Sequence, residues 1–183
     1  MKILLLVGHS ILKDGRCTSA DGRSKGGCLE YNWCKNFSAQ LKKELEKAGH
    51  RVKRVVCPEK EFASSKEEKP YKLDIEHNGN FDLVMELHLN SSDNSSANGT
   101  EVLYVSDTGR EYAEAIEKQL STVFRSRGAK YRNDLYILNQ TNAPAVILET
   151  FFCTSKDDYK KAKGKKKRTK LAKLVVKEIE NVK

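Results

Sequence analysis

Closely spaced cysteine pairs are absent from this sequence, and its cysteines are odd in number. The five are Cys17, Cys28, Cys34, Cys57 and Cys153. An odd set without a Cys-x-x-Cys pair argues against a disulfide framework and against a metal module held by four cysteines. We therefore predict reduced thiols, most of them buried, in a reducing compartment.

Long hydrophobic runs are also missing. No apolar stretch approaches the roughly 20 residues that a membrane-spanning helix needs, so we expect no contact with a membrane. Residues 1–7 imitate a secretion signal, but their apolar stretch has only five residues and no small-residue cleavage site follows. We interpret residues 3–7 as a buried first strand. The protein is then expected to have no export route of its own and to be cytoplasmic.

Acidic residues are too few to balance the basic ones: 25 Asp and Glu stand against 34 Lys and Arg, and the formal net charge is +9. The excess is concentrated in nine residues, which are Lys160, Lys161, Lys163, Lys165, Lys166, Lys167, Arg168, Lys170 and Lys173. Such a run usually solvates a helix face, but it also suits a polyanion such as teichoic acid or nucleic acid. Aromatic residues are absent after Tyr159. Because no platform for base stacking accompanies the charge, nucleic acid is the less favoured partner.

The alternation of strand and helix patterns predicts a single α/β domain in these 183 residues. Short apolar runs predict strands at residues 3–7, 52–56, 81–89, 101–105, 135–138 and 145–148. Helical spacing predicts helices at 29–48, ended by Gly49, and at 108–124, with Asp107 or Thr108 as N-cap. A basic helix is expected at about 155–182, with a break at Gly164. Residues 59–80 are polar and weakly patterned, which predicts a long connection with at most one short element.

Four side chains suited to metal binding or proton transfer lie at or near the ends of these strands. His9 follows the first strand, His88 and Glu149 lie near the ends of two others, and Glu30 opens the first helix. Sites in open α/β sheets form beyond the carboxyl ends of parallel strands, so we expect the four to meet there. Two histidines and one glutamate suit zinc with an open position for water, and the other carboxylate is a candidate base. Each residue alone also has a structural explanation, as a loop histidine, a helix-end charge or an ion-pair partner.

The third predicted strand carries two more polar residues beside its histidine. Glu86, His88 and Asn90 alternate with apolar residues and therefore project to one face of the sheet. Three polar side chains on an otherwise buried strand are costly unless they have partners. A metal and a substrate would supply such partners.

On these residues the sequence resembles the zinc-dependent N-acetylmuramoyl-L-alanine amidases of the amidase-3 type, which include phage endolysin catalytic domains. The segments that carry the resemblance are Val7-Gly8-His9, Glu30-Tyr31-Asn32, Asp82-Leu83-Val84-Met85-Glu86-Leu87-His88-Leu89-Asn90, Asn98-Gly99-Thr100-Glu101-Val102 and Leu138-Asn139-Gln140-Thr141-Asn142-Ala143-Pro144-Ala145-Val146-Ile147-Leu148-Glu149. It implies one catalytic domain over residues 1–183. The implied fold is a twisted, mostly parallel central sheet of about six strands with helices on both faces. No separate wall-binding domain is visible in the sequence.

The resemblance implies that His9, Glu30 and His88 bind zinc and that Glu149 is the catalytic acid and base. The implied substrate is peptidoglycan, cleaved at the amide between N-acetylmuramic acid and L-alanine of the stem peptide. With the carbonyl polarised and a water molecule acidified by zinc, Glu149 takes the proton of the water and passes it to the departing alanine nitrogen. Asn90 is expected to hydrogen-bond the substrate or to fix its loop.

Three features depart from the family pattern. Glu86 stands where the family usually has a small residue, and we expect it to orient a zinc-bound histidine or to pair with a lysine. Phe151 and Ser155 replace a glycine and an asparagine after Glu149, which changes the expected shape of the substrate cleft. The arginine-bearing helix that commonly precedes the third strand is not evident in residues 59–80.

Two other functions remain open on the sequence. A zinc carboxypeptidase or small-molecule amidohydrolase would use similar ligands, with Arg132 as the nearby basic residue for a terminal carboxylate. A non-catalytic module that binds cell wall or nucleic acid through the basic run would need no zinc. For an amidase without an export signal, we expect a phage lysin that stays in the cytoplasm until a membrane lesion releases it, or an autolysin freed when the mother cell lyses.

Overall fold

The computed structural model of the protein describes residues 1–182 and contains one six-stranded sheet. The strands are β1 (Lys2–Val7), β2 (Arg51–Val55), β3 (Leu83–Asn90), β4 (Thr100–Tyr104), β5 (Ser126–Tyr131) and β6 (Ala145–Phe152). Their order across the sheet is β2-β1-β3-β6-β4-β5, and every neighbouring pair is parallel except β4 with β6. The predicted α/β fold and its mostly parallel sheet are confirmed.

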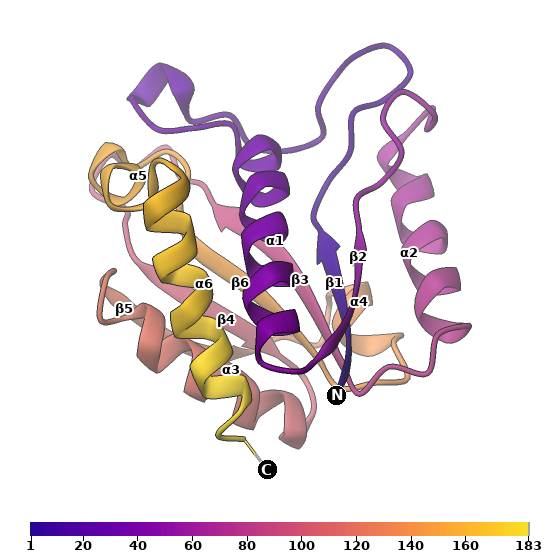
Figure 1. Ribbon diagram of the computed structural model, residues 1–183. Helices are drawn as coiled ribbons and strands as arrows, with labels where there is room; N and C mark the ends of the chain where they lie inside the picture. Colours follow the sequence, from indigo (N-terminus) through magenta and orange to yellow (C-terminus); the bar gives the residue numbers. More distant parts are fainter. Residues whose placement is uncertain (183) are drawn as a thin grey trace.

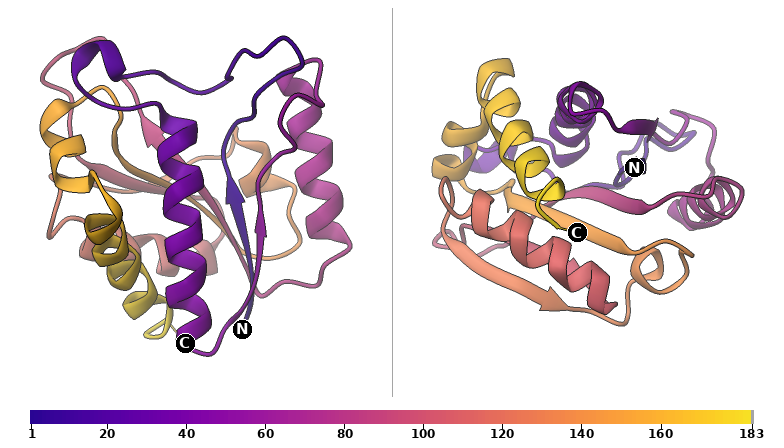
Figure 2. Two further views of the ribbon diagram at one scale, coloured as in Figure 1. Left: turned by 45° about the horizontal axis from the view of Figure 1, so that its top comes forward. Right: turned by 60° about the horizontal axis from the view of Figure 1, so that its bottom comes forward.

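Helices cover both faces of this sheet, as predicted. Over the described residues they are α1 (Glu30–Lys47), α2 (Glu68–His77), α3 (Asp107–Leu120), α4 (Tyr136–Asn139), α5 (Lys156–Ala162) and α6 (Lys165–Ile179), with 3₁₀ turns at Arg23–Lys25 and Ser65–Glu67. Buried side chains of α1, α3, α5 and α6 share one core, and those of α2 and α4 share the core on the opposite face. The helices α1 and α6 run side by side in Figure 1 and in both views of Figure 2.

The first strand shows why the sheet is buried on both sides. Ile3 and Leu5 belong to the core under α1, whereas Leu4 and Leu6 belong to the core under α2, as the two-residue period of a strand requires. The N-terminal apolar run is therefore the buried strand that was predicted. In residues 1–182, no helix has both the length and the apolar character needed to cross a bilayer.

The carboxyl ends of β1 and β3 point to the same end of the molecule. The segment between β1 and α1 crosses this end, which is the top of Figure 1. The N-terminus and the last turn of α6 lie at the opposite end. This arrangement brings the loop after β1, the start of α1 and the end of β3 together, where we expected the site.

The predicted helix boundaries are largely confirmed. The helix α1 is followed by Gly49, which has φ +88° and leaves the helical conformation. Ser106, rather than Asp107 or Thr108, is the N-cap of α3, because its side chain accepts a hydrogen bond from the Gly109 amide. The basic C-terminal segment breaks at Gly164, as predicted, with φ +92°.

After α3, one strand prediction was wrong and one strand was missed. Residues 135–138 were expected to be a strand, but they form most of the short helix α4 and the residue before it, with Ile137 and Leu138 buried against the sheet. The sixth strand is instead β5, whose sequence SRGAKY has no apolar alternation. It lies at the edge of the sheet, and Gly128, at φ +82°, sits at a register shift against β4. Backbone pairing rather than side-chain burial makes this segment a strand.

The helix α2 lies where the sequence was expected to form a long connection with at most one short element. Its buried face includes Glu68, Lys72 and Glu76, which are four residues apart. A helix with a charged buried stripe has no apolar periodicity, and this is why the pattern missed it. The charges have partners: Glu76, for example, accepts hydrogen bonds from the backbone amides of Asn142 and Ala143. A helix before the third predicted strand is therefore present.

Candidate metal centre and active-site pocket

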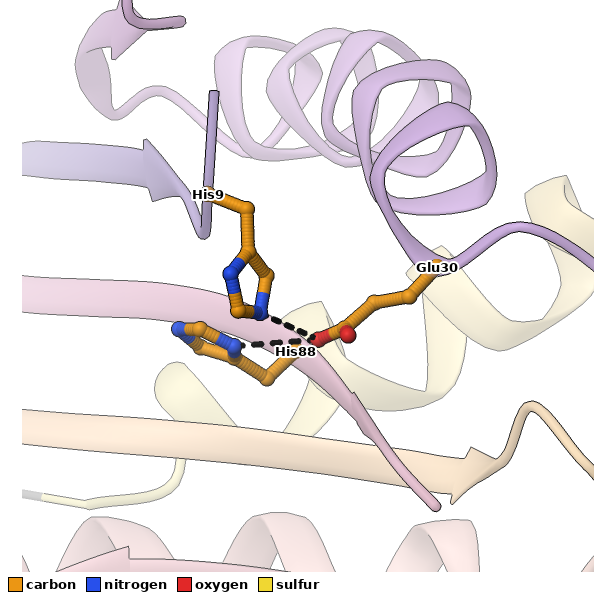
Figure 3. A group of neighbouring side chains, drawn as sticks. All are labelled: His9, Glu30 and His88. Carbon is orange, nitrogen blue, oxygen red and sulfur yellow. Dashed lines mark hydrogen bonds and ion pairs between the residues drawn. The ribbon is translucent and has the colours of Figure 1, made fainter. Parts of the chain in front are cut away.

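Two histidines and a glutamate come together at the carboxyl end of the sheet (Figure 3). His9 follows β1, His88 lies near the end of β3, and Glu30 is the first residue of α1. The Oε1 atom of Glu30 lies 3.1 Å from His9 Nε2 and 3.0 Å from His88 Nδ1. The ligand atoms of the three residues all lie within 4.8 Å of one another. The structure thus brings the three predicted metal ligands together.

The backbone at Gly8 and His9 lets the two imidazoles meet. His9 has φ +67°, in the left-handed region that is uncommon for residues other than glycine. The Gly8 amide donates to the Leu87 carbonyl at 3.0 Å, which holds the ends of β1 and β3 together. A Cβ atom on Gly8 would lie 2.2 Å from the His88 ring. Glycine at this position leaves space for the ring centroids of His9 and His88 to approach to 4.8 Å, edge to face.

Glu30 is fixed by backbone donors as well as by the histidines. Its Oε1 accepts from the Leu89 amide at 3.0 Å and its Oε2 from the Ala20 amide at 3.1 Å. The start of α1 also favours negative charge. Burial raises the pKa of this carboxyl group, but the hydrogen bonds to His88 and His9 outweigh burial and hold its pKa well below the usual range. Glu30 is therefore anionic, as a candidate metal ligand should be.

Glu149 lies on β6 directly beside His88 in the register of the sheet. Burial raises the pKa of Glu149 to about 7; the charge of His88 opposes this shift, and the charge of Glu30 adds to it. Its Oε2 atom is buried and finds no hydrogen-bond partner within residues 1–182. A carboxyl group with a free oxygen and a pKa near neutrality is suited to proton transfer.

Two of the candidate ligands, His9 and His88, share one cavity of about 220 Å³ with Glu149. Its lining comprises His9, Glu68, Lys72, Glu86, His88, Leu135, Tyr136, Ile137, Ile147 and Glu149. The walls away from the histidines are largely apolar, and an apolar pocket with a few convergent polar groups is the usual form of a small-molecule site. The cavity is therefore the candidate active site.

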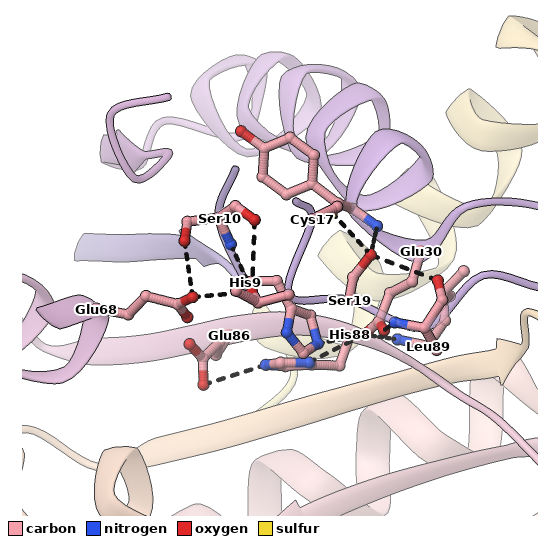
Figure 4. Close-up of polar contacts among 12 residues, drawn as sticks. His9, Ser10, Cys17, Ser19, Glu30, Glu68, Glu86, His88 and Leu89 are labelled. Atoms are coloured by element: carbon pink, nitrogen blue, oxygen red, sulfur yellow. Dashed lines mark hydrogen bonds and ion pairs between the residues drawn. The ribbon is translucent and has the colours of Figure 1, made fainter. Parts of the chain in front are cut away.

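Glu86 makes both of the contacts expected from the sequence. Its Oε1 accepts from Lys72 Nζ at 2.7 Å, and its Oε2 lies 3.4 Å from His88 Nε2 (Figure 4). Burial raises the pKa of Glu86, but the charges of Lys72 and His88 outweigh it and hold the pKa well below the usual range. Glu86 is an ionised neighbour of the metal-ligand group.

Two further candidate residues do not line the cavity. Asn90 donates through Nδ2 to Glu101 at 2.9 Å, so its amide is fixed by β4. Arg132 is exposed and pairs with Asp134 at 2.7 Å. The structure does not bring Arg132 to the metal-ligand group.

Three residues that bring polar groups to the cavity were missed in the sequence: Glu68, Lys72 and Tyr136. Glu68 accepts hydrogen bonds from Ser10 Oγ at 2.8 Å and from Thr18 Oγ1 at 2.9 Å, and so fastens α2 to the segment after His9 (Figure 4). The available signal was the spacing of Glu68 and Lys72 on one helix face. Tyr136 was hidden because its segment was predicted to be a strand.

The donor set fits zinc. Two imidazole nitrogens and one carboxylate oxygen are common zinc ligands, and three protein ligands leave a position for water or substrate. Both rings direct a nitrogen at the same Glu30 oxygen, so the donors converge on one point. Such a donor group, beside a free carboxyl group at the carboxyl edge of a mostly parallel sheet, suits a metal-dependent hydrolase.

Comparison with known proteins gives the family. The chain belongs to the N-acetylmuramoyl-L-alanine amidase family Amidase_3, whose model matches residues 3–181. The probable cell wall amidase LytH of Staphylococcus epidermidis is 28% identical over 158 residues, which are 85% of this chain and 49% of LytH. The chain thus spans about half the length of this relative. The amidase LytC of Bacillus subtilis is 34% identical over 90 residues, which are 45% of this chain and 18% of LytC.

Solved structures include a similar endolysin domain. The catalytic domain of the CD27L endolysin targeting Clostridia Difficile is 46% identical, with a TM-score of 0.92, over 99% of this chain and 97% of that one. The CwlD amidase of Clostridioides difficile shares the fold, with 22% identity, a TM-score of 0.83 and coverage of 99% and 97%. The family resemblance seen in the sequence is confirmed.

Proposed function

We propose that this chain hydrolyses the amide between N-acetylmuramic acid and the L-alanine of the stem peptide in peptidoglycan. Membership of the amidase family and the similarity to an endolysin catalytic domain support this activity. The observation that carries the proposal is the shared cavity, in which His9 and His88 face the free carboxyl group of Glu149.

The proposed metal is zinc, held by His9, Glu30 and His88. When bound, zinc supplies a Lewis acid that polarises a carbonyl group and lowers the pKa of a water molecule toward neutrality. Glu149 accepts the proton of that water and then donates it to the alanine nitrogen, because an amide anion is a very poor leaving group. The pKa of about 7 that burial gives Glu149 suits both transfers. Asn90, fixed by Glu101, holds the end of β3 in place.

Product analysis tests the reaction. Mass spectrometry of digested peptidoglycan should show free lactyl ends on muramic acid together with new alanine N-termini. Release of single amino acids would instead identify a carboxypeptidase. Metal analysis should give about one zinc per chain, as expected for a site with three protein ligands. Zinc far below one equivalent in active protein would contradict the proposed metal.

We also propose that α5 and α6 attract the enzyme to anionic wall polymers. Of the nine basic residues between 160 and 173, all but Arg168 are exposed. The opposite face of α6 is buried, with Leu171, Ala172 and Val175 in the core. The lysines therefore form a surface that points to solvent, and charge complementarity to a phosphate-rich polymer supports the partner.

The proposed biological setting is a phage lysin or a mother-cell autolysin, which stays in the cytoplasm until a membrane lesion or cell lysis releases it. The 46% identity to an endolysin catalytic domain supports the first of these settings. Fractionation of producing cells before and after a membrane lesion tests whether the enzyme stays in the cytoplasm until release. Enzyme in the medium of intact cells would contradict this location.

A further inference from the structure

A buried ion pair lies beside the metal-ligand group. Lys72 of α2 and Glu86 of β3 are 1% and 2% exposed, and Lys72 Nζ lies 2.7 Å from Glu86 Oε1. Removing two charges from water is costly, and apolar residues of similar volume are often at least as stabilising. Stability alone therefore does not explain this pair.

The second oxygen of Glu86 connects the pair to His88. Glu86 Oε2 lies 3.4 Å from His88 Nε2 (Figure 4). The other ring nitrogen, Nδ1, lies 3.0 Å from Glu30 Oε1, the atom that also contacts His9. The His88 ring is thus placed between two carboxylates, with Nδ1 toward the metal-ligand group and Nε2 toward Glu86.

This placement decides which nitrogen is free to bind a cation. A neutral imidazole carries one N–H, and the nitrogen without it supplies the lone pair for a metal. A carboxylate beside Nε2 favours the tautomer with hydrogen on Nε2 and leaves the lone pair on Nδ1. A lysine ammonium has donors only, so Lys72 keeps one carboxylate oxygen occupied while the other faces the ring.

We propose that Lys72 and Glu86 are a positioning pair for His88: Glu86 accepts the Nε2–H of the ring, Lys72 fixes the carboxylate, and Nδ1 is left free to bind zinc beside His9 and Glu30. The proposal rests on the metal site put forward above. The proposed role of Lys72 and Glu86 requires no contact between either residue and the substrate.

The variant Glu86→Gln gives a sharp test. Lys72 would take the amide oxygen of the new side chain, which turns the amide NH₂ toward His88 Nε2. Two donors then face each other, and the ring is pushed toward the tautomer with hydrogen on Nδ1. Zinc affinity, measured by competition with a chromophoric chelator, should fall about 10- to 100-fold.

A second substitution should restore part of the affinity. In Lys72→Met/Glu86→Gln the amide can flip and present its oxygen to His88 Nε2, so this double variant should bind zinc more tightly than Glu86→Gln alone. A purely structural role predicts the opposite order, because the double variant removes more contacts. Weaker zinc binding by the double variant would overturn the proposal.

The apolar replacement separates positioning from folding. Lys72→Met/Glu86→Leu removes both buried charges, so the metal-free protein should unfold at an equal or higher temperature, while zinc affinity falls about tenfold or more. In the zinc-loaded wild type, the His88 Nε2–H proton should resonate downfield in NMR spectra, and this shift should be lost in the variant. Unchanged affinity and an unchanged resonance would overturn the proposal.

A matched control uses the surface ion pair of half-buried Lys42 and exposed Glu46 on α1. Lys42→Met/Glu46→Gln should leave zinc affinity at the wild-type value, and an equal loss in this control would overturn the proposal. If the wild type binds no zinc, the metal site itself fails and the positioning role fails with it. If wild type and variants bind zinc equally, only the positioning role fails.

Discussion

Glu149 combines two properties at the residue scale that a structural carboxylate lacks. Its Oε2 has no hydrogen-bond partner in the described part of the chain, and its pKa is raised by burial to about 7. Replacing it with glutamine keeps the shape but removes the carboxyl group that can accept and donate a proton. We expect Glu149→Gln to lose on the order of 10²-fold or more of wall hydrolysis while zinc content stays unchanged. The exposed Glu114→Gln on α3 is the control, and near wild-type hydrolysis by Glu149→Gln would refute the role of this residue.

The same carboxyl group makes the stability of the metal-free protein depend on pH. The pKa of Glu149 is 4.5 by its ordinary value and about 7 in the fold, so the folded state holds this proton more tightly than the unfolded chain does. The contribution of Glu149 to the free energy of unfolding is greatest below pH 4.5 and is lost as the pH rises to about 7. Above that pH, this group no longer changes the free energy of unfolding. Relative to wild type, Glu149→Gln should therefore gain on the order of 3 kcal/mol in unfolding free energy between pH 4.5 and pH 8. Urea unfolding of chelator-treated protein measures this difference, and a difference that does not change with pH would contradict it.

Gly8 is a residue whose absent side chain shapes the site. A Cβ atom there would lie 2.2 Å from the His88 ring, and the ring has little room to move between Glu30 and Glu86. We expect Gly8→Ala to displace the ring and to weaken zinc binding about tenfold or more, a loss like that caused by removing a partner that orients a ligand. Gly15→Ala is the control for backbone strain alone, because Gly15 has φ +85° and a Cβ atom there meets nothing within 4 Å. Equal zinc affinity of the two variants, measured by chelator competition, would show that the space at Gly8 does not matter.

At the scale of elements, the segment before α1 fixes the position of Glu30. The Cys28 amide donates to the Cys153 carbonyl at the end of β6, at 3.1 Å, and a Cβ atom on Gly27 would lie 1.8 Å from the same oxygen. Because that atom is backbone, the loop and not a flexible side chain must move. We expect Gly27→Ala to cost about 1–3 kcal/mol of stability and to weaken zinc binding. Urea unfolding and chelator competition measure the two effects. Wild-type values in both measurements would contradict the role of this contact in fixing the position of Glu30.

The elements also show how much of the molecule could be predicted. The strand β1 and the helix α1 were predictable because apolar side chains make their buried faces. The candidate ligands His9 and His88 were predictable because they lie at or near the ends of apolar strands. The helix α2 was not, because charged side chains make its buried face. Lys72 reaches Glu86 only through the packing of α2 on the sheet, which no local pattern encodes. In the same way, the edge strand β5 exists through backbone pairing with β4.

At the scale of the whole molecule, the charge is distributed unevenly. The metal-ligand group and its cavity hold four glutamates, Glu30, Glu68, Glu86 and Glu149, and one lysine, Lys72, whereas the net charge of the chain is +9. The cationic excess lies on α5 and α6, on the solvent side of the helix layer. The proposed attraction to the wall and the proposed hydrolysis at the cavity therefore belong to different surfaces, and they should be separable by mutation.

Neutralising the basic surface should weaken attraction to the wall without changing the chemistry. The test variant replaces four exposed lysines by glutamine, at Lys165, Lys166, Lys170 and Lys173. The control removes the same charge from scattered exposed positions, at Lys13, Lys43, Lys53 and Lys66. We expect the test variant to bind isolated walls more weakly at low salt, with the difference fading near 1 M salt, where the screening length is only about 3 Å. Hydrolysis of a small, uncharged muramoyl peptide should match wild type in both variants. Walls stripped of teichoic acid should bind the wild type and the test variant alike, whereas equal losses in the test variant and the control would show that net charge, and not this surface, attracts the enzyme.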